Sequence, residues 1–248
     1  MNSELLKNVG DAIKKTVPKK RIAVAFSGGV DSTLVSKMLA DLEYDVTLLT
    51  IGFPESHDIL FAKEVNEQLN FPHHILEIDG DAFEKISADI NKKIQTENLS
   101  WNENCIAFYY VSKLAQSLDL DTVVTANGID ELFCGYNAYR DVIPDGENAV
   151  NQMMDQKLEN ETKMMRAVNL VSSEFGVTII QPLLSAEFVT FAKTVPVSEK
   201  ILGPDDLVRK HAIRSLARDV GVPEISYAKR KKALQYGTQI HKRLLKTR

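Results

Sequence analysis

Six consecutive residues near the N-terminus have the types and spacing of a phosphate-binding loop. They are Ser27-Gly28-Gly29-Val30-Asp31-Ser32, and they follow an apolar run that ends at Phe26. Glycines let the backbone turn tightly and approach a ligand closely. Successive N–H groups and the start of the next helix attract an anion, and the hydroxyls add donors. The segment predicts a phosphate site, although it is neither a Walker A nor a GxGxxG loop.

Asp31 would repel a phosphate in this loop unless a cation lay between them. A bridging Mg²⁺ satisfies both groups, because carboxylate and phosphate oxygens are its usual ligands. The plainer alternative is a capped strand–turn–helix without a ligand, since Ser and Asp are favoured helix caps. A cap needs one such residue and this loop has several, which favours the magnesium-bridged phosphate.

The elements that must position this loop alternate between strands and helices. Apolar runs predict buried strands at 22–26, 45–53, 74–78 and 122–126. Helical periodicity predicts helices at 34–42, 57–69, 81–95 and 103–118. This alternation is typical of an α/β fold with a doubly wound parallel sheet, which binds ligands at the carboxyl ends of its strands.

The rest of the chain is expected to be mainly helical. An amphipathic lead-in helix is predicted within residues 1–20. Residues 21–248 then form one domain, with a nucleotide-binding α/β half at 21–140 and a mainly helical half at 141–248. Strand signals nearly vanish after about residue 130, and long helical stretches are predicted at 147–174 and 205–220.

The composition is that of an ordinary globular protein. The 248 residues include 30 Lys and Arg against 34 Asp and Glu, a net charge of −4, which gives no general electrostatic case for a nucleic-acid partner. Cys105 and Cys134 form no CxxC, so neither a zinc site nor a redox pair is predicted. Without an apolar signal core or a membrane-length apolar run, a cytoplasmic protein with no membrane partner is expected.

The phosphate loop resembles the signature loop of the ATP pyrophosphatases, α/β enzymes of the adenine nucleotide α-hydrolase-like fold that adenylate a substrate and release pyrophosphate. The segment from Ile51 to Asp58 narrows the resemblance to asparagine synthetases. The resemblance implies ATP as cosubstrate, with Phe26 and Ile51 beside the adenosine. It implies that ATP and pyrophosphate contact the loop residues Ser27, Gly28, Gly29, Val30, Asp31 and Ser32.

A second motif, at residues 126–136, is similar to the Gly-Glu-Gly-Ala-Asp-Glu-Leu-Phe-Gly-Gly-Tyr motif of the same family. It reads Ala126-Asn127-Gly128-Ile129-Asp130-Glu131-Leu132-Phe133-Cys134-Gly135-Tyr136. By this resemblance Asp130 is the second magnesium ligand beside Asp31. Thr125, Ala126 and Gly128 are expected against the nucleotide. Glu131 is expected to cap the following helix.

The C-terminal basic run Lys229-Arg230-Lys231-Lys232 resembles the family's Arg-x-Lys element, whose lysine neutralises charge on the transferring phosphoryl group. The match assigns this catalytic role to Lys232, with Lys231 as the alternative. A solvated basic tail is the ordinary reading of such a run. Residues 182–184 and 210–214 also resemble family segments, so the likeness spans about residues 20–242.

Three residues depart from the family pattern. All three concern the step in which the activated substrate is transferred to its acceptor. Asn127 stands at the catalytic glutamate of the motif, Ser185 replaces an aspartate, and Ile180 replaces an arginine. Asn cannot act as a base near neutral pH, so a glutamate restored at this position is expected to speed amide formation. The 248 residues show no likeness to the family's glutaminase domain, so we expect free ammonia, another amine or a separate glutaminase subunit to supply nitrogen.

The leading hypothesis is an ATP- and Mg²⁺-dependent ligase that activates a carboxylate, aspartate by default, as an acyl-adenylate and transfers it to ammonia or another amine. A second hypothesis is an ATP pyrophosphatase that modifies a tRNA or nucleobase or transfers sulfur. The missing CxxC and the net charge of −4 argue against it. A third is a catalytically impaired nucleotide-binding subunit. The retained Asp31, Asp130 and Lys232 argue against that one.

Overall fold

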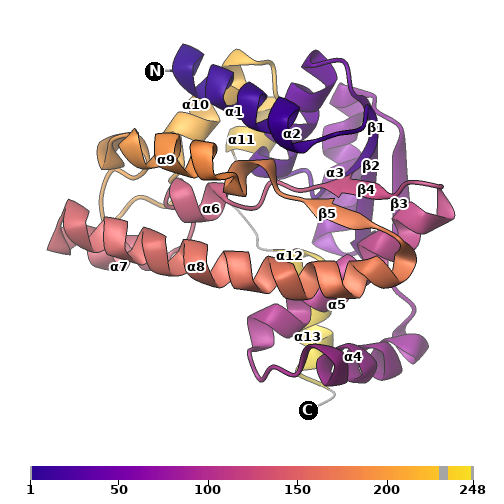
Figure 1. Ribbon diagram of the computed structural model, residues 1–248. Helices are drawn as coiled ribbons and strands as arrows, with labels where there is room; N and C mark the ends of the chain where they lie inside the picture. Colours follow the sequence, from indigo (N-terminus) through magenta and orange to yellow (C-terminus); the bar gives the residue numbers. More distant parts are fainter. Residues whose placement is uncertain (1, 229–233, 247–248) are drawn as a thin grey trace.

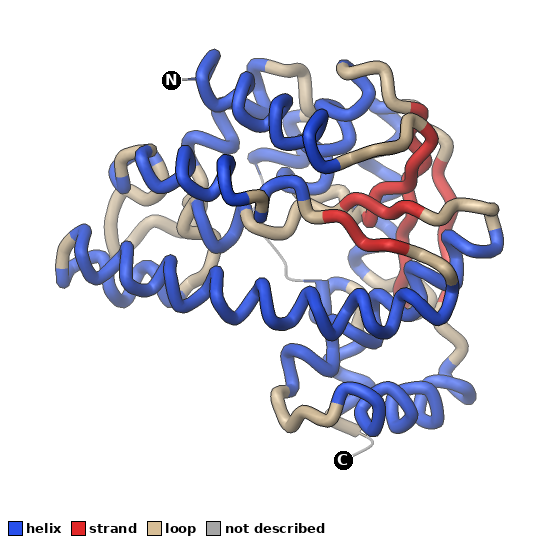
Figure 2. The backbone as a smooth tube through the Cα atoms, in the orientation of Figure 1, coloured by secondary structure: helices blue, strands red, loops and turns tan. Residues whose placement is uncertain are grey.

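A five-stranded parallel sheet forms the centre of the computed structural model, which describes residues 2–228 and 234–246 (Figures 1 and 2). Its strands lie in the order β3-β2-β1-β4-β5, and every neighbouring pair is parallel. The strands are β1 Arg21–Ala25, β2 Asp45–Gly52, β3 His73–Glu77, β4 Thr122–Val124 and β5 Thr178–Ile180. The strand order reverses between β1 and β4, so the predicted doubly wound sheet is confirmed. In sheets of this kind, ligands usually bind at such a reversal.

Helices cover both faces of this sheet. They are α1 Asn2–Thr16, α2 Val30–Asp41, α3 His57–Leu69, α4 Gly80–Ile94, α5 Leu99–Ser117, α6 Ile129–Leu132, α7 Ala138–Val142, α8 Glu147–Ser172, α9 Ala186–Thr194, α10 His211–Asp219, α11 Glu224–Ala228, α12 Leu234–Gly237 and α13 Ile240–Leu244. None of the helices in the described residues is long and apolar enough to span a membrane.

The alternation of side chains along the strands divides the core into two hydrophobic groups. Ile22 and Val24 of β1 belong to the group that includes α1, α2 and α10, whereas Ala23 belongs to the group that includes α5 and α8. Figure 1 shows α4, α5, α8 and α13 on one side of the sheet and α1, α2 and α10 on the other. Buried apolar surface on both faces is what fixes a parallel sheet between helical layers.

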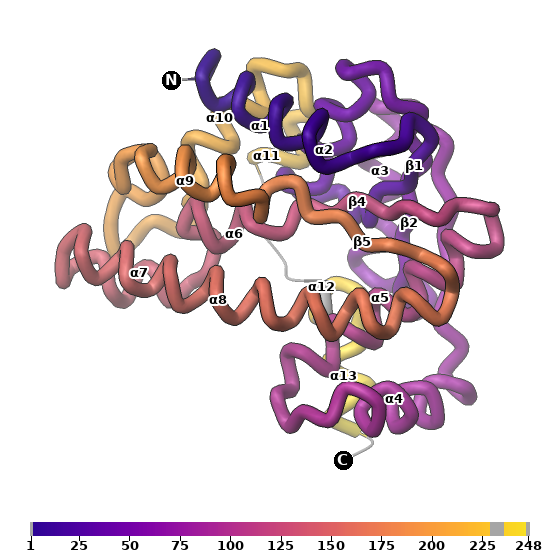
Figure 3. The backbone as a smooth tube through the Cα atoms, in the orientation of Figure 1, coloured from indigo at the N-terminus to yellow at the C-terminus, as the bar shows by residue number. Residues whose placement is uncertain are grey.

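Distant segments of the chain meet in this arrangement. In Figure 3 the N-terminal α1 lies beside α9 and α10, and α12 and α13 lie near α5. The 26-residue helix α8 crosses the molecule and contacts α5, α6 and β5. Cys105 and Cys134 are buried and form no disulfide with each other.

The structure differs from the sequence prediction in the C-terminal half. Strand β5 has three residues, too few for a visible alternation, and is held by parallel pairing with β4. Helix α9 was likewise not predicted. The predicted helix at 205–220 is helical only over His211–Asp219. Asp206 accepts from the N–H groups of Leu202, Val208 and Arg209, and both Arg209 and Lys210 have positive φ, which interrupts the helical path.

Candidate active site

The phosphate loop joins β1 to α2 at the point where the strand order reverses. Helix α2 begins at Val30, and no side chain caps its N-terminus at Gly29. Gly28 has a φ of +75°, and a Cβ at this residue would lie 3.1 Å from the carbonyl oxygen of Phe61. The loop therefore requires glycine at this point, and it leaves the start of α2 open to an anion.

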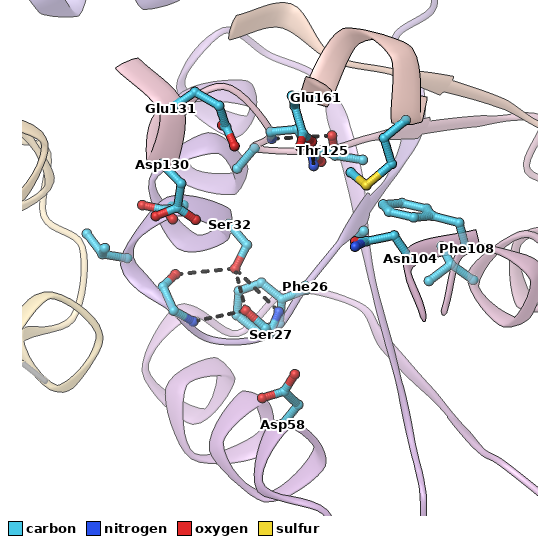
Figure 4. Close-up of a pocket in the computed structure, with 18 of the residues that line it drawn as sticks. Phe26, Ser27, Ser32, Asp58, Asn104, Phe108, Thr125, Asp130, Glu131 and Glu161 are labelled. Carbon is cyan, nitrogen blue, oxygen red and sulfur yellow. Dashed lines mark hydrogen bonds between the residues drawn. The ribbon is translucent and has the colours of Figure 1, made fainter. Parts of the chain in front are cut away.

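Hydroxyl groups hold the loop in one shape (Figure 4). The Ser27 N–H donates to Ser32 Oγ at 3.3 Å, and Ser32 Oγ donates to the Gly29 carbonyl at 3.2 Å. Thr33 Oγ1 donates to the same carbonyl at 2.9 Å. Ser226 of α11 donates to the Gly28 carbonyl and lies 2.9 Å from Thr33 Oγ1. These bonds pre-organise the loop without a ligand.

The two predicted magnesium ligands lie on either side of one buried lysine. Lys210 Nζ is 2.5 Å from Asp31 Oδ2 and 2.6 Å from Asp130 Oδ1. The Lys210 side chain is 1% exposed, and burial lowers its pKa against the opposing effect of the Asp31 charge. A Cβ at Gly135 would lie 1.8 Å from Asp130 Oδ1 and 2.5 Å from Lys210 Cε. Gly135 thus makes room for the aspartate–lysine–aspartate cluster.

This cluster fits a divalent cation. Asp31 Oδ1 is buried and has no hydrogen-bond partner among the described residues. Two carboxylates in the first turns of α2 and α6, at the anion-binding loop, form the oxygen-rich donor set that Mg²⁺ uses together with phosphate oxygens. Without a metal, the Lys210 ammonium supplies the counter-charge. The sequence motif Lys210-His211-Ala212-Ile213-Arg214 carried a family resemblance, which is the signal that could have identified this lysine.

A cavity of about 510 Å³ opens beside the loop. Of the residues expected at the nucleotide, it is lined by Phe26, Ser27, Gly29, Val30, Asp31, Ser32, Ile51, Thr125 and Ala126. Phe26 and Ile51 are 3% and 2% exposed, and Phe108 of α5 adds an aromatic wall. Its size and its mixture of apolar and polar walls suit a small-molecule ligand.

Gly28 and Gly128 shape the loops and are not among the described residues that line this cavity. Gly128 has a φ of +107°, and a Cβ at this residue would lie 2.6 Å from the carbonyl oxygen of Leu183. Like Gly28, it is needed for a backbone conformation and a close approach. Its expected contact with ATP stays a prediction.

Lys231 and Lys232 lie outside the described residues, so their catalytic role stays a prediction. The described residues on both sides of the gap at 229–233 lie at the cavity or next to a residue that lines it. Before the gap, Ser226 lines the cavity and binds the phosphate loop. After it, Gly237 approaches Asp58 so closely that a Cβ would lie 1.8 Å from Asp58 Oδ1, and Asp58 lines the cavity.

An acidic group occupies the other wall of the cavity. Glu131 Oε2 accepts from the Gly128 N–H at 3.0 Å, so Glu131 caps α6 as expected, and the Tyr136 hydroxyl donates to Glu131. Glu161, from the distant helix α8, accepts from Asn127 Nδ2 at 2.6 Å. Burial raises the pKa of both carboxyl groups, and the charge of Glu161 raises that of Glu131 further. No local sequence pattern identifies Glu161 as a residue of this cavity.

His73 of β3 contributes a side-chain contact within the sheet. His73 Nε2 lies 2.8 Å from Thr50 Oγ1, which donates to the Phe26 carbonyl at 2.7 Å. Burial, with a smaller effect of the nearby His74 and Lys63 charges, lowers the pKa of His73 to about 4. No cluster of three or more metal-ligating side chains occurs within residues 2–228 and 234–246.

A solved structure supports the fold assignment. The NMN synthetase of Francisella tularensis matches this chain with a TM-score of 0.50 and 16% identity, over 95% of this chain and 75% of that one. At this identity the likeness shows the fold alone. The likeness agrees with the α/β fold with a parallel sheet that the sequence predicts.

Sequence comparisons identify the family. A candidate glutamine-hydrolysing asparagine synthetase of Methanocaldococcus jannaschii is 28% identical over 201 residues, covering 77% of this chain and 36% of that protein. The asparagine synthetase of Bos taurus is 23% identical over 215 residues, covering 83% of this chain and 37% of that protein. The chain thus spans just over a third of the length of these relatives. Since the profile of the asparagine synthase family matches residues 4–170, more than half of the sequence, the chain belongs to the asparagine synthase family.

Proposed function

We propose that this protein is an ATP- and Mg²⁺-dependent amide-forming ligase. A substrate carboxylate attacks the α-phosphorus of ATP, which gives an acyl-adenylate and pyrophosphate. An amine then forms a bond to the acyl carbon, and AMP leaves with the electron pair of the broken C–O bond. The carboxylate is aspartate by default, and the amine is ammonia.

One observation carries this proposal. The hydroxyl-rich loop after β1 and the carboxylates Asp31 and Asp130 meet at the reversal of strand order, with Lys210 between the carboxylates. Such a site holds a charged polyphosphate and stabilises a departing pyrophosphate. A capped strand–turn–helix that binds no ligand would not require two carboxylates and a buried lysine at the same edge of the sheet.

Each group of side chains has a distinct task in this proposal. Ser27 to Ser32 bind the pyrophosphate part of ATP, and Phe26, Ile51, Thr125 and Ala126 surround the adenosine. Asp31 and Asp130 would hold Mg²⁺, which would neutralise phosphate charge when bound. Lys210 adds a fixed positive charge beside them. Lys232, or Lys231 in its place, would neutralise charge on the reacting phosphoryl group by its resemblance to the family element.

The proposal for the nitrogen donor starts from the family to which the chain belongs. The relatives are named glutamine-hydrolysing, and this chain spans just over a third of their length. We propose that ammonia reaches the site directly or from a separate glutaminase subunit. The altered residues Asn127, Ile180 and Ser185 leave other carboxylates and amines as alternatives to aspartate and ammonia.

A pyrophosphate exchange screen tests the proposal. The purified protein is incubated with ATP, Mg²⁺ and labelled pyrophosphate in the presence of each standard amino acid. We expect exchange that depends on one amino acid and is removed by EDTA. Asp31→Asn and Asp130→Asn should each lower its rate by about 10²–10³-fold, the typical cost of removing a group that stabilises developing charge.

The control is Asp155→Asn, an exposed carboxylate of α8 paired with Lys193 at 2.5 Å. It should exchange at the wild-type rate. Exchange with none of the amino acids, or full exchange in either active-site variant, would contradict the proposed function. Exchange that appears only with added RNA would favour the nucleobase-modifying alternative.

A further inference from the structure

The altered motif residue Asn127 holds a carboxylate that comes from elsewhere in the chain. Its Nδ2 donates to Glu161 Oε1 at 2.6 Å, although the two residues are 34 positions apart. Glu161 lies on α8, is 4% exposed and lines the same cavity as the phosphate loop. Figure 4 shows it near Thr125, on the side of the cavity away from Ser27 and Asp58. A carboxylate is therefore present at the place where the motif has lost one.

The fold holds this carboxylate firmly. Helix α8 packs against α5 and α6, and Met164 and Met165, in the turn after Glu161, are each 3% exposed. The Asn127 N–H lies 3.4 Å from Thr125 Oγ1, which orients the loop that carries the amide. An amide that donates to a carboxylate stabilises its ionised form. Asn127 thus orients Glu161 and favours the charged state.

The charged groups near Glu161 come from two elements, α6 and α8 itself. Glu131 of α6 acts on it electrostatically, and the Tyr136 hydroxyl donates to Glu131. Lys157, one turn earlier on α8, lines the same cavity, and its Nζ lies 5.1 Å from the Tyr136 ring centroid. Asn98, Asn104 and Asn160 contribute uncharged amides to the cavity wall. Burial makes Glu161 more basic than a surface glutamate, as a general base near neutral pH requires.

We propose that Glu161 is the proton acceptor of the amide-forming step and that Asn127 is its positioning residue. The inference rests on the proposed function and adds the group that this function lacks. The neutral amine attacks the acyl carbon of the adenylate, the C–N bond forms, and the nitrogen gains positive charge. Glu161 takes one proton from that nitrogen while the C–O bond to the phosphate breaks and AMP leaves. The amide is neutral, and Glu161 later returns the proton to water.

Glu161→Gln tests this role while preserving the size of the side chain. The amino acid that supports pyrophosphate exchange is used with ATP and Mg²⁺, and the amine probe is ammonium chloride or hydroxylamine. We expect unchanged exchange and a loss of about 10²–10⁴-fold in amide formation from ammonia, the usual contribution of a general base. Hydroxamate formation should fall much less, because hydroxylamine is a stronger nucleophile and needs less help from a base.

Glu159→Gln is the matched control. Glu159 lies on the same helix two residues earlier, faces Lys163 at 2.6 Å and is largely exposed. This variant receives the same substitution and should keep the wild-type rate of both half-reactions. It separates loss of the base from a general effect of removing a carboxylate from α8.

Asn127→Ala tests the positioning role through the pH profile. Loss of the Asn127 donor raises the pKa of Glu161, so the acid limb of amide formation should move to higher pH while the profile of pyrophosphate exchange stays in place. Ammonia-dependent amide formation unchanged in Glu161→Gln, or equal losses with ammonia and hydroxylamine, would overturn the inference. So would a wild type that exchanges pyrophosphate but forms no amide from ammonia. Absence of exchange would instead reject the proposed function, and the inference with it.

Discussion

Replacing Lys210 with methionine removes the cation between Asp31 and Asp130 and keeps a side chain of similar length. The ammonium group lies 2.5 Å and 2.6 Å from the two carboxylates and is 1% exposed. Removing one partner of a buried ion pair costs about 3–5 kcal/mol, because a charge is left in a poorly solvated site. Since the two aspartate side chains are 18% and 14% exposed, we expect the lower end of this range.

The assay is thermal unfolding with EDTA or with Mg²⁺, without nucleotide. For a chain of this size each kcal/mol changes Tm by about 2–4 °C, so a loss of about 3 kcal/mol lowers it by about 6–12 °C. The proposed Mg²⁺ site uses the same carboxylates, so Mg²⁺ should restore part of the loss in Lys210→Met. The Tm of the wild type should change little, because Lys210 already neutralises the pair.

Lys163→Met is the matched control. Lys163 Nζ lies 2.6 Å from Glu159 Oε1, but both side chains are more than half exposed. Such surface pairs contribute about 0–1 kcal/mol. An equal fall in Tm for the two variants would refute the reasoning, and so would the absence of a Mg²⁺ effect on the Tm of Lys210→Met. The reasoning is that the buried Lys210 ammonium lies at the proposed metal site.

Three further predictions concern the loop, the sheet and the acidic wall. Gly28→Ala should weaken ATP binding at least about tenfold in calorimetric titration. A left-handed backbone costs a non-glycine residue about 1–2 kcal/mol, and the new Cβ would lie 3.1 Å from the Phe61 carbonyl oxygen. Wild-type affinity in this variant would contradict the prediction. Burial holds the pKa of His73 at about 4, below its ordinary 6.5, so its neutral form stabilises the fold above pH 6.5 and that contribution is lost as pH falls to 4. Relative to His73→Gln, urea unfolding of the wild type should lose about 2 kcal/mol over that range, allowing for partial exposure, and a difference that does not vary with pH would exclude it. Asn127→Glu should slow amide formation, because it places a second carboxylate against Glu161, and a faster variant would restore the interpretation of Asn127 as a missing base.

Local sequence patterns were sufficient for most of the fold. Four strands and the helices between them are visible because buried parallel strands form unbroken apolar runs and amphipathic helices repeat their apolar residues with helical period. Strand β5 has only three residues, so it carries almost no pattern, and pairing with β4 stabilises it. The break before His211 depends on the Asp206 carboxylate and two left-handed residues, which a periodicity cannot reveal.

In the candidate site too, some residues could be predicted from the sequence and others only from the folded structure. Local sequence patterns predicted the candidate phosphate loop with Asp31, and the family resemblance of residues 126–136 predicted Asp130. The groups that balance these charges become visible in the folded chain alone. Lys210 contacts Asp31 across 179 positions, and Glu161 contacts Asn127 across 34. A buried charge needs a partner in space, and nothing in local spacing says which distant helix will provide it.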